Sequence, residues 1–135
     1  MASATLLGDG RVLVVGGGAG SDCCDGAALA SAEVWDPTTL TFSPAGSLGE
    51  ARLYHTATPL RDGRVLIVGG GPPDEPRSSA ELWDPVTGSF SPAASLAQGR
   101  LSHTATLLPD GRVVVIGGSV ENDTPLSSTE IWQLD

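Results

Sequence analysis

Short apolar runs alternate along the chain with turns rich in glycine, proline and aspartate. The run RVVVIGG, residues 112–118, contains an unbroken β-branched series, which is typical of a strand buried on both faces. The run before it is TATLL at residues 104–108, and Pro109, Asp110 and Gly111 lie between the two runs. The Asp-Gly pair predicts a β-hairpin with a two-residue turn. The pattern predicts short antiparallel strands and an all-β fold.

This hairpin pattern occurs three times, within residues 3–18, 52–71 and 100–119. Trp35 and Trp83 are 48 residues apart, and Trp83 and Trp132 are 49 residues apart. A period near 50 residues with a glycine pair in each copy is typical of a radial or stacked repeat architecture.

Each copy is predicted to form four strands, of which the hairpin supplies the first two. A third strand is expected at SAEVWDP, residues 31–37, and a fourth at SFSPAASL, residues 89–96. The first copy has no Arg-x-x-His before its hairpin, and the third copy stops after its third strand. The repeat at the end of the chain is therefore expected to lack a fourth strand.

Several short motifs recur in the copies: His-Thr-Ala-Thr, Asp-Gly-Arg-Val, Gly-Gly and Glu-x-Trp-Asp-Pro, with an aromatic residue near Ser-Pro. Together they resemble the kelch repeat in its bacterial form. The resemblance covers essentially the whole chain. It implies that each copy is a four-stranded antiparallel blade of a β-propeller, with the first strand innermost and the fourth outermost. We expect one domain, residues 1–135, with blades at about 1–50, 51–98 and 99–135.

The number of blades bears on assembly. Kelch propellers usually have six or seven blades, so three blades would leave an apolar face and open strand edges exposed at each end, and such surfaces favour association. We expect a homodimer that closes a six-bladed ring through two equivalent contacts. Two other accounts stay open: a piece of a longer propeller, and an engineered excision.

Residues that recur in the copies are predicted to hold the blades together. The recurring residues are Arg52, His55, Arg100 and His103, then Glu33, Glu81 and Glu130, and finally Trp35, Trp83 and Trp132. Each His is expected to pack at the start of the first strand and to bond to the main chain, each Glu to pair with an Arg between blades, and each Trp to pack between blades. Catalysis or metal binding by the His residues, and sugar stacking by the Trp residues, are the alternatives.

The loops between the second and third strands differ among the copies, which leaves them free to bind a ligand. They concentrate carboxylates around one expected mouth of the channel, at Asp22, Asp25, Asp74, Glu75, Glu121 and Asp123. Oxygen ligands of this kind suit calcium, although solvated acidic loops that keep the protein in solution are the simpler interpretation.

Charge and cysteine content narrow the function further. The chain has 16 acidic and 7 basic residues, a net charge of −9, which argues against nucleic acid or an anionic membrane as partners. No apolar run approaches a membrane span and no charged signal region opens the chain, so a cytoplasmic location is the default expectation.

Cys23 and Cys24 are expected to be ordinary thiols; a vicinal disulfide, an intermolecular bridge and a metal site stay open.

Catalytic motifs are sparse. Galactose oxidase-like members of the kelch group need two Tyr residues at a copper site, and this chain has only Tyr54. No Gly-x-Ser-x-Gly, phosphate-binding loop, Cys-x-x-Cys or Asp-box pattern is present, although Asp74 and Glu75 could serve a hydrolase. We expect a non-catalytic module that binds protein or carbohydrate or acts as a scaffold, without a cofactor. A cation-dependent carbohydrate-binding protein or hydrolase is the alternative.

Overall fold

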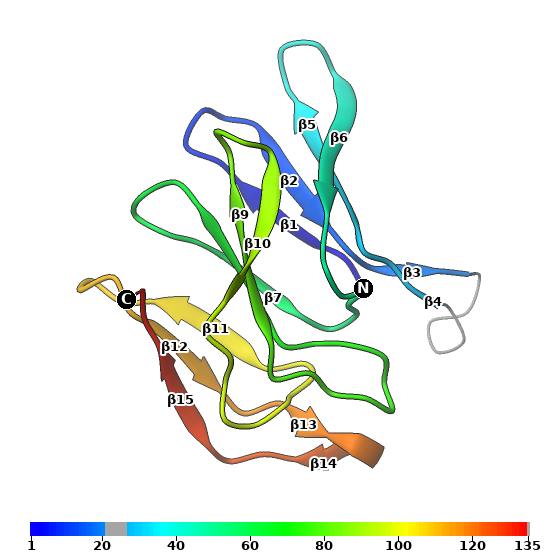
Figure 1. Cartoon of the computed structure of the whole chain (residues 1–135), viewed down its shortest axis with the longest axis vertical. Coiled ribbons are helices and arrows are strands. Elements are labelled where there is room, and N and C mark those ends of the chain that lie inside the picture. Colours follow the sequence, from blue (N-terminus) through cyan, green and yellow to red (C-terminus); the bar gives the residue numbers. More distant parts are fainter. Residues whose placement is uncertain (21–26, 135) are drawn as a thin grey trace.

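The structure is a computed structural model that describes residues 1–20 and 27–134. Three antiparallel sheets follow one another along the chain, and we call them blades 1 to 3 (Figure 1). Blade 1 consists of β1 (Ser3–Leu6), β2 (Val12–Val15), β5 (Ser31–Asp36) and β6 (Thr41–Ser47). Blade 2 consists of β7 (Thr56–Pro59), β8 (Val65–Val68), β9 (Ala80–Asp84) and β10 (Ser89–Ala93). Blade 3 consists of β11 (Thr104–Leu107), β12 (Val113–Ile116) and β15 (Thr129–Trp132).

The expected all-β fold is confirmed. Blades 1 and 2 have four strands in chain order, whereas blade 3 has three and ends at β15, as the third copy predicts. Two short ribbons extend from the loops of the terminal blades: β3 (Gly18–Ala19) with β4 (Ala27–Ala28), and β13 (Ser119–Val120) with β14 (Thr124–Pro125). The 3₁₀ turn η1 (Glu121–Asp123) joins β13 to β14. Within the described residues, no helix is long and apolar enough to cross a membrane.

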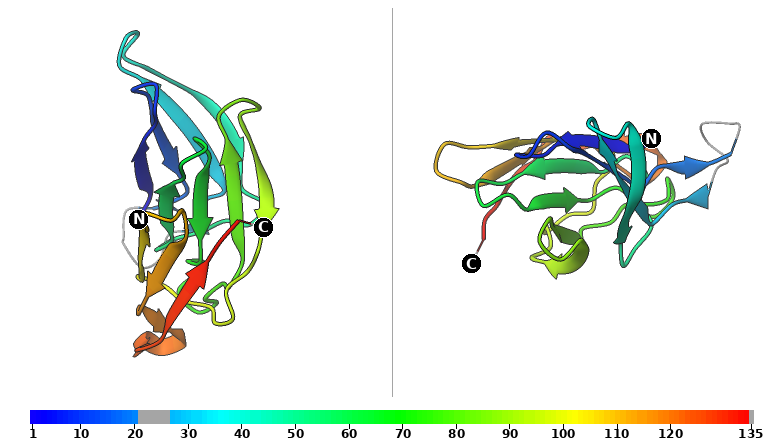
Figure 2. Two further views of the ribbon diagram at one scale, coloured as in Figure 1. Left: turned by 90° about the vertical axis from the view of Figure 1, so that its left-hand side faces the viewer. Right: turned by 90° about the horizontal axis from the view of Figure 1, so that it is seen from above.

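The blades stack so that equivalent strands adjoin. The first strand of blade 2, β7, contacts both β1 and β11, and the fourth strands β6 and β10 also contact each other. The two views of Figure 2 show this stack from the side and from above. The first strands therefore form one side of an arc and the later strands the other, which is the arrangement of neighbouring propeller blades.

The turn between the first two strands has three residues, so the prediction of a two-residue turn is wrong. In blade 2 the Leu60 N–H donates to the Arg64 carbonyl (2.8 Å) and the Gly63 N–H donates to the Leu60 carbonyl (3.1 Å). Gly63 has φ +91°, so the loop is a type I turn followed by a left-handed glycine. The Asp62 carboxylate accepts hydrogen bonds from the main-chain N–H and the Nε of Arg64, which accounts for the repeated Asp-Gly-Arg.

The apolar core lies between the blades rather than inside them. One cluster joins blades 1 and 2, and a second joins blades 2 and 3. The first cluster is built on Leu13, Val15, Val34, Val65, Ile67 and Trp83, and the second on Leu66, Val68, Leu82, Val113, Val115 and Trp132. Blade 2 contributes one face to each cluster, so it is covered on both sides.

Burial on both faces, predicted for the run at residues 112–118, is wrong for that strand and is found instead in the equivalent strand of blade 2. All four residues of β8 are buried, whereas β2 and β12 alternate between buried and partly or fully exposed positions. Within the described chain, the outward side chains of β2 and β12 have no neighbouring blade to cover them.

Candidate functional site: blade faces and connecting loops

Two buried arginines secure the segments that connect one blade to the next. The Arg100 side chain is fully buried; its Nη1 donates to the carbonyls of Gly117 (2.9 Å) and Ser128 (3.1 Å), and its Nη2 lies 2.7 Å from Glu130 Oε2. The Arg100 carbonyl accepts a hydrogen bond from the Gly70 N–H of blade 2 (2.9 Å). The side chain is thus held in blade 3 while the main chain is bonded to blade 2.

Arg52 repeats this arrangement one blade earlier. Its Nη1 donates to the carbonyls of Gly69 and Ser79, its Nη2 lies 3.3 Å from Glu81 Oε2, and its carbonyl accepts from the Gly17 N–H of blade 1. The prediction of an Arg–Glu pair between blades is therefore wrong in one respect: each pair lies within one repeat. The link between blades is made by the arginine main chain.

The glutamates of the two pairs also hold the connecting segments directly. Glu81 accepts from the Gly49 N–H (2.7 Å), and Glu130 accepts from the N–H groups of Ala97 (2.6 Å) and Gln98 (3.1 Å). Burial raises the pKa of Glu130, but the hydrogen bonds from Ala97, Arg100 and Gln98 outweigh it and leave the pKa below its usual value. Both glutamates therefore act as hydrogen-bond acceptors in the connection between two blades.

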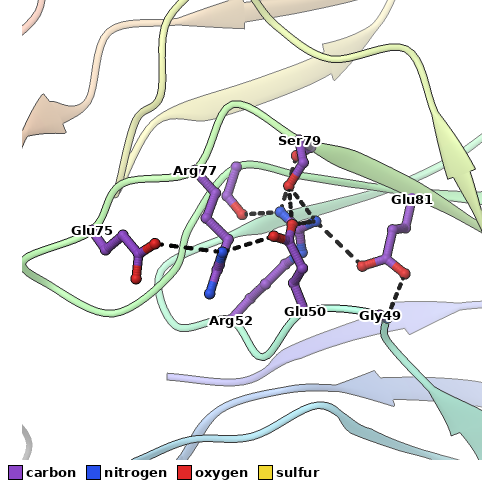
Figure 3. A network of polar contacts seen from close by, with 8 residues as sticks. Gly49, Glu50, Arg52, Glu75, Arg77, Ser79 and Glu81 are labelled. Carbon is purple, nitrogen blue, oxygen red and sulfur yellow. Dashed lines mark hydrogen bonds and ion pairs between the residues drawn. The ribbon is translucent and has the colours of Figure 1, made fainter.

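Blade 2 adds a second layer of charge around Arg52 (Figure 3). Glu50 accepts a short hydrogen bond from the Ser79 hydroxyl, lies 3.4 Å from Arg52 Nη2, and accepts from Arg77 Nη1 at 2.8 Å. The Ser79 hydrogen bond, followed by the charges of Arg77 and Arg52, lowers the pKa of Glu50 against the opposing effect of burial. Blade 3 has Gln98 in place of Glu50, so this layer belongs to blade 2 alone.

Glu33, the third glutamate of the series, has a different environment. It is exposed on β5, and among the described residues it has no ion pair. The pair predicted for every repeat is therefore present in two.

The two histidines bridge neighbouring blades through hydroxyl groups. His55 Nε2 lies 2.9 Å from Ser3 Oγ of blade 1, and His103 Nε2 lies 2.9 Å from Thr56 Oγ1 of blade 2. The prediction of a main-chain partner missed this contact, which the recurring Ser or Thr at the start of each first strand could have indicated. Burial, and next the positive charge of the preceding arginine, lowers the pKa of each imidazole to about 4, so both are neutral near pH 7.

A histidine beside a hydroxyl is also the beginning of a nucleophile–base pair. In such a pair a third group orients the base, yet Nδ1 of both His55 and His103 is buried without a hydrogen-bond partner among the described residues. The contact also occurs twice, once with Ser3 and once with Thr56. Both observations favour a structural role.

The tryptophans differ according to their blade. Trp83 is buried and its indole N–H donates to the Ala45 carbonyl of blade 1 (2.9 Å), and Trp132 likewise donates to the Ala94 carbonyl of blade 2 (2.8 Å). Each therefore attaches its own blade to the blade before it, Trp83 at β6 and Trp132 at the residue that follows β10. Trp35 is partly exposed on the outer side of blade 1, and no indole hydrogen bond is found for it within the described residues.

One end of the stack forms a face of connecting loops, as the alternation of strand directions predicts. Tyr54, Leu101 and Ser102 from the segments between blades line a pocket of about 280 Å³ there, together with Pro73, Ser119 and Asp123. Tyr54 and Ser102 both have positive φ values, 56° and 54°, which non-glycine residues rarely adopt. The Ser102 N–H donates to the Tyr54 carbonyl (3.0 Å), so successive connecting segments are bonded to each other.

The acidic loop residues do not converge in the described part of the chain. Asp74, Glu75, Glu121 and Asp123 are exposed, and Glu75 lies 4.0 Å from Arg77. Among the described residues, no group of three or more His, Cys, Asp or Glu side chains could hold a metal ion. Four predicted positions lie outside the described residues: Asp22, Cys23, Cys24 and Asp25.

The geometry defines a class of protein, a stack of β-propeller blades. Residues 3–49 match the model of the Kelch motif, and the strand order of that segment recurs in blade 2 and, as far as its third strand, in blade 3. Residues 3–49 therefore carry a kelch motif, and the sheets of blades 2 and 3 are consistent with further kelch blades. No curated protein matches it significantly.

Proposed function

We propose that the protein is a non-catalytic kelch module that binds through its two outer blade faces, and that a second copy of the chain is one such partner. Kelch modules generally serve as binding scaffolds, which is consistent with the family match. Two arcs of three blades would form a ring of six. The proposal for a second copy rests on the contrast between covered and uncovered blade faces.

The uncovered faces are apolar in the same way as the covered ones. We define the first face as the outward side of blade 1, formed by Leu6, Val12, Val14, Trp35 and Phe42. The last face is the outward side of blade 3, formed by Thr104, Thr106, Val114, Ile116 and Ile131. Phe42 is 58% exposed and Ile131 is 48% exposed, whereas β8 is buried on both faces.

The two faces correspond to the two sides of an existing junction. At the junction of blades 2 and 3, Leu66 and Val68 of blade 2 pack against Val113 and Val115 of blade 3. The last face is equivalent to the blade 2 side of that junction. The first face is equivalent to the blade 3 side. A last face and a first face therefore offer each other apolar surfaces of matching type, and two such contacts close a ring with twofold symmetry.

Polar contacts at this new junction would be fewer than at the internal ones. Thr104 of the last face would meet Ala2, which stands where the later repeats have His55 and His103. We therefore expect a dimer that depends on concentration and is weaker than the internal junctions.

Sedimentation equilibrium over a wide concentration range tests the proposal. The expected result is a mass that rises from that of one chain to that of two. Ile116→Glu places a charge on the last face and should keep the protein monomeric, while Val86→Glu, at a turn residue that is 90% exposed, should not. Folded protein that stays monomeric at every concentration would overturn the second-copy proposal.

The loop face supports a second candidate function, cation-dependent carbohydrate binding or hydrolysis. Its pocket of about 280 Å³ combines Tyr54 with Ser102 and Asp123, side chains of the kinds that contact sugar rings and hydroxyl groups. Melting temperatures in calcium and in EDTA, each with and without a panel of simple sugars, test this candidate, because a ligand that prefers the folded state raises the melting temperature. No shift with any combination would argue against it.

A further inference from the structure

The free edge of blade 3 is a second surface, distinct from the last face. In blades 1 and 2 the third strand pairs with a fourth, whereas β15 has no partner on that side among the described residues. A groove of about 320 Å³ runs beside β15, and its lining includes Leu82, Ala93, Trp132 and Leu134. The groove therefore lies between β15 and the strands of blade 2.

We propose that this edge binds an extended peptide segment, antiparallel to β15, with the chemistry of the repeat's own fourth strand: Ser or Thr, then Phe, Ser, Pro and Ala. Addition of a strand to an open sheet edge draws affinity from main-chain hydrogen bonds and specificity from side-chain pockets. The proposal does not depend on closure of a ring, because the groove beside β15 is lined by none of the residues that form the last face.

The register of the bound segment follows from the two complete blades. Phe42 pairs with Trp35 in blade 1, and Phe90 pairs with Trp83 in blade 2. Carried to blade 3, the same register places an aromatic residue of the segment opposite Trp132. That residue would face blade 2, as Phe90 faces blade 1 in the first core cluster.

Side chains of β15 are already held in position, and its main chain can form hydrogen bonds with an added strand. Trp132 is buried and held by its hydrogen bond to the Ala94 carbonyl, and Glu130 is held by Ala97 and Gln98. The strand Thr129–Trp132 contains no proline, so each of its residues has an N–H. The fourth strands, in contrast, contain Pro44 and Pro92, and a proline suits the strand that ends a sheet.

Fluorescence anisotropy with a labelled peptide GSFSPAASLA, the sequence of residues 88–97, tests the proposal. We expect saturable binding, and a loss of at least about tenfold in affinity when the peptide's Phe is replaced by Ser, since an aromatic pair would be lost. On the protein, Leu134→Asp should weaken binding, whereas Val86→Asp, far more exposed and outside the groove, should not. Equal binding of both peptides, or no saturable binding, would overturn the proposal.

Two further measurements locate the binding and separate it from dimerisation. The peptide should slow hydrogen exchange at the amides of Thr129–Trp132; protection elsewhere without protection of β15 would contradict the proposal. The Ile116→Glu variant should still bind the peptide, because Ile116 lies on the last face and not in the groove. A failed dimer with retained peptide binding would thus reject the second-copy proposal and leave this one standing.

Discussion

β8 of blade 2 and β2 of blade 1 are close in sequence, VLIV and VLVV, but differ in their surroundings. Every residue of β8 is buried between two neighbouring blades, whereas the outward residues of β2 are partly exposed. The same contrast separates Glu81 from Glu33 and Trp83 from Trp35. Each repeat therefore supplies half of each junction, and its stability depends on which neighbouring blades are present.

The largest expected effect comes from the paired and unpaired glutamates. Glu81→Gln should lower the free energy of unfolding by about 3 kcal/mol, because it leaves the buried Arg52 without its charged acceptor. Glu33→Gln at the equivalent strand position should change it by less than about 0.5 kcal/mol, since Glu33 is exposed. Urea unfolding of both variants measures the difference, and equal losses would contradict the structural role of the Arg52 network.

A smaller effect is expected from matched valines. Val65→Ala should cost about 2 kcal/mol, because Val65 is fully buried between blades 1 and 2. Val12→Ala, at the corresponding position on the first face, should cost about 1 kcal/mol or less in the monomer. Repeating the Val12→Ala measurement at concentrations where the dimer forms sharpens the comparison: the loss should grow if a second copy covers that face.

The histidines should make stability depend on pH. Their pKa values are lowered to about 4, below the ordinary value near 6.5, so between these pH values the unfolded chain binds protons that the folded chain does not. The free energy of unfolding should fall as the pH drops through this window, by about 2 kcal/mol for each histidine between pH 7 and pH 5.

Urea unfolding at pH 7 and pH 5 measures this effect. A variant with both His55→Gln and His103→Gln should lose most of the pH dependence between pH 6.5 and 5, a window above the range in which the carboxylates with lowered pKa values titrate. An unchanged pH dependence would show that the imidazoles are not the groups responsible.

The smallest expected effect comes from substituting Glu50, which belongs to the additional ion-pair layer of blade 2. Glu50→Gln should cost about 1 kcal/mol, and less at high salt, because Glu50 is partly exposed and its ion pairs are screened. The reciprocal change Gln98→Glu should give no comparable gain, since blade 3 has Leu126 where blade 2 has Arg77. Thermal unfolding in low and high salt compares the two; a loss that is independent of salt would argue against an electrostatic contribution.

Several local features could be predicted from the sequence and several could not. The three copies, the four-strand order and the missing fourth strand of blade 3 follow from spacing and strand patterns. The length of the Asp-Gly turn could not be predicted correctly, because the left-handed glycine that ends a three-residue loop looks the same in sequence as the second residue of a two-residue turn.

The sequence shows which side chains recur, but it does not show which residues they contact. Arg52 and Glu81 stand out as repeated charges, but a spacing cannot say whether they meet within a blade or between blades. The hydroxyl partners of the histidines, Ser3 and Thr56, lie 52 and 47 residues away from them. The recurring Ser or Thr indicates a candidate partner, but whether the contact forms depends on how two sheets stack, which the sequence of one repeat does not specify.

The sequence by itself determined the strands and the repeat, because these follow from hydrogen-bonding and side-chain periodicities within each copy, and its motifs carried the resemblance that the kelch match over residues 3–49 supports. Only the tertiary structure decided which copies of a shared pattern are buried. Val12 and Val65 occupy the same place in the repeat, yet a neighbouring blade removes only Val65 completely from water. Whether an apolar residue is buried depends on the adjacent blade as well as on the residue itself, so burial can be read only from the assembled blades.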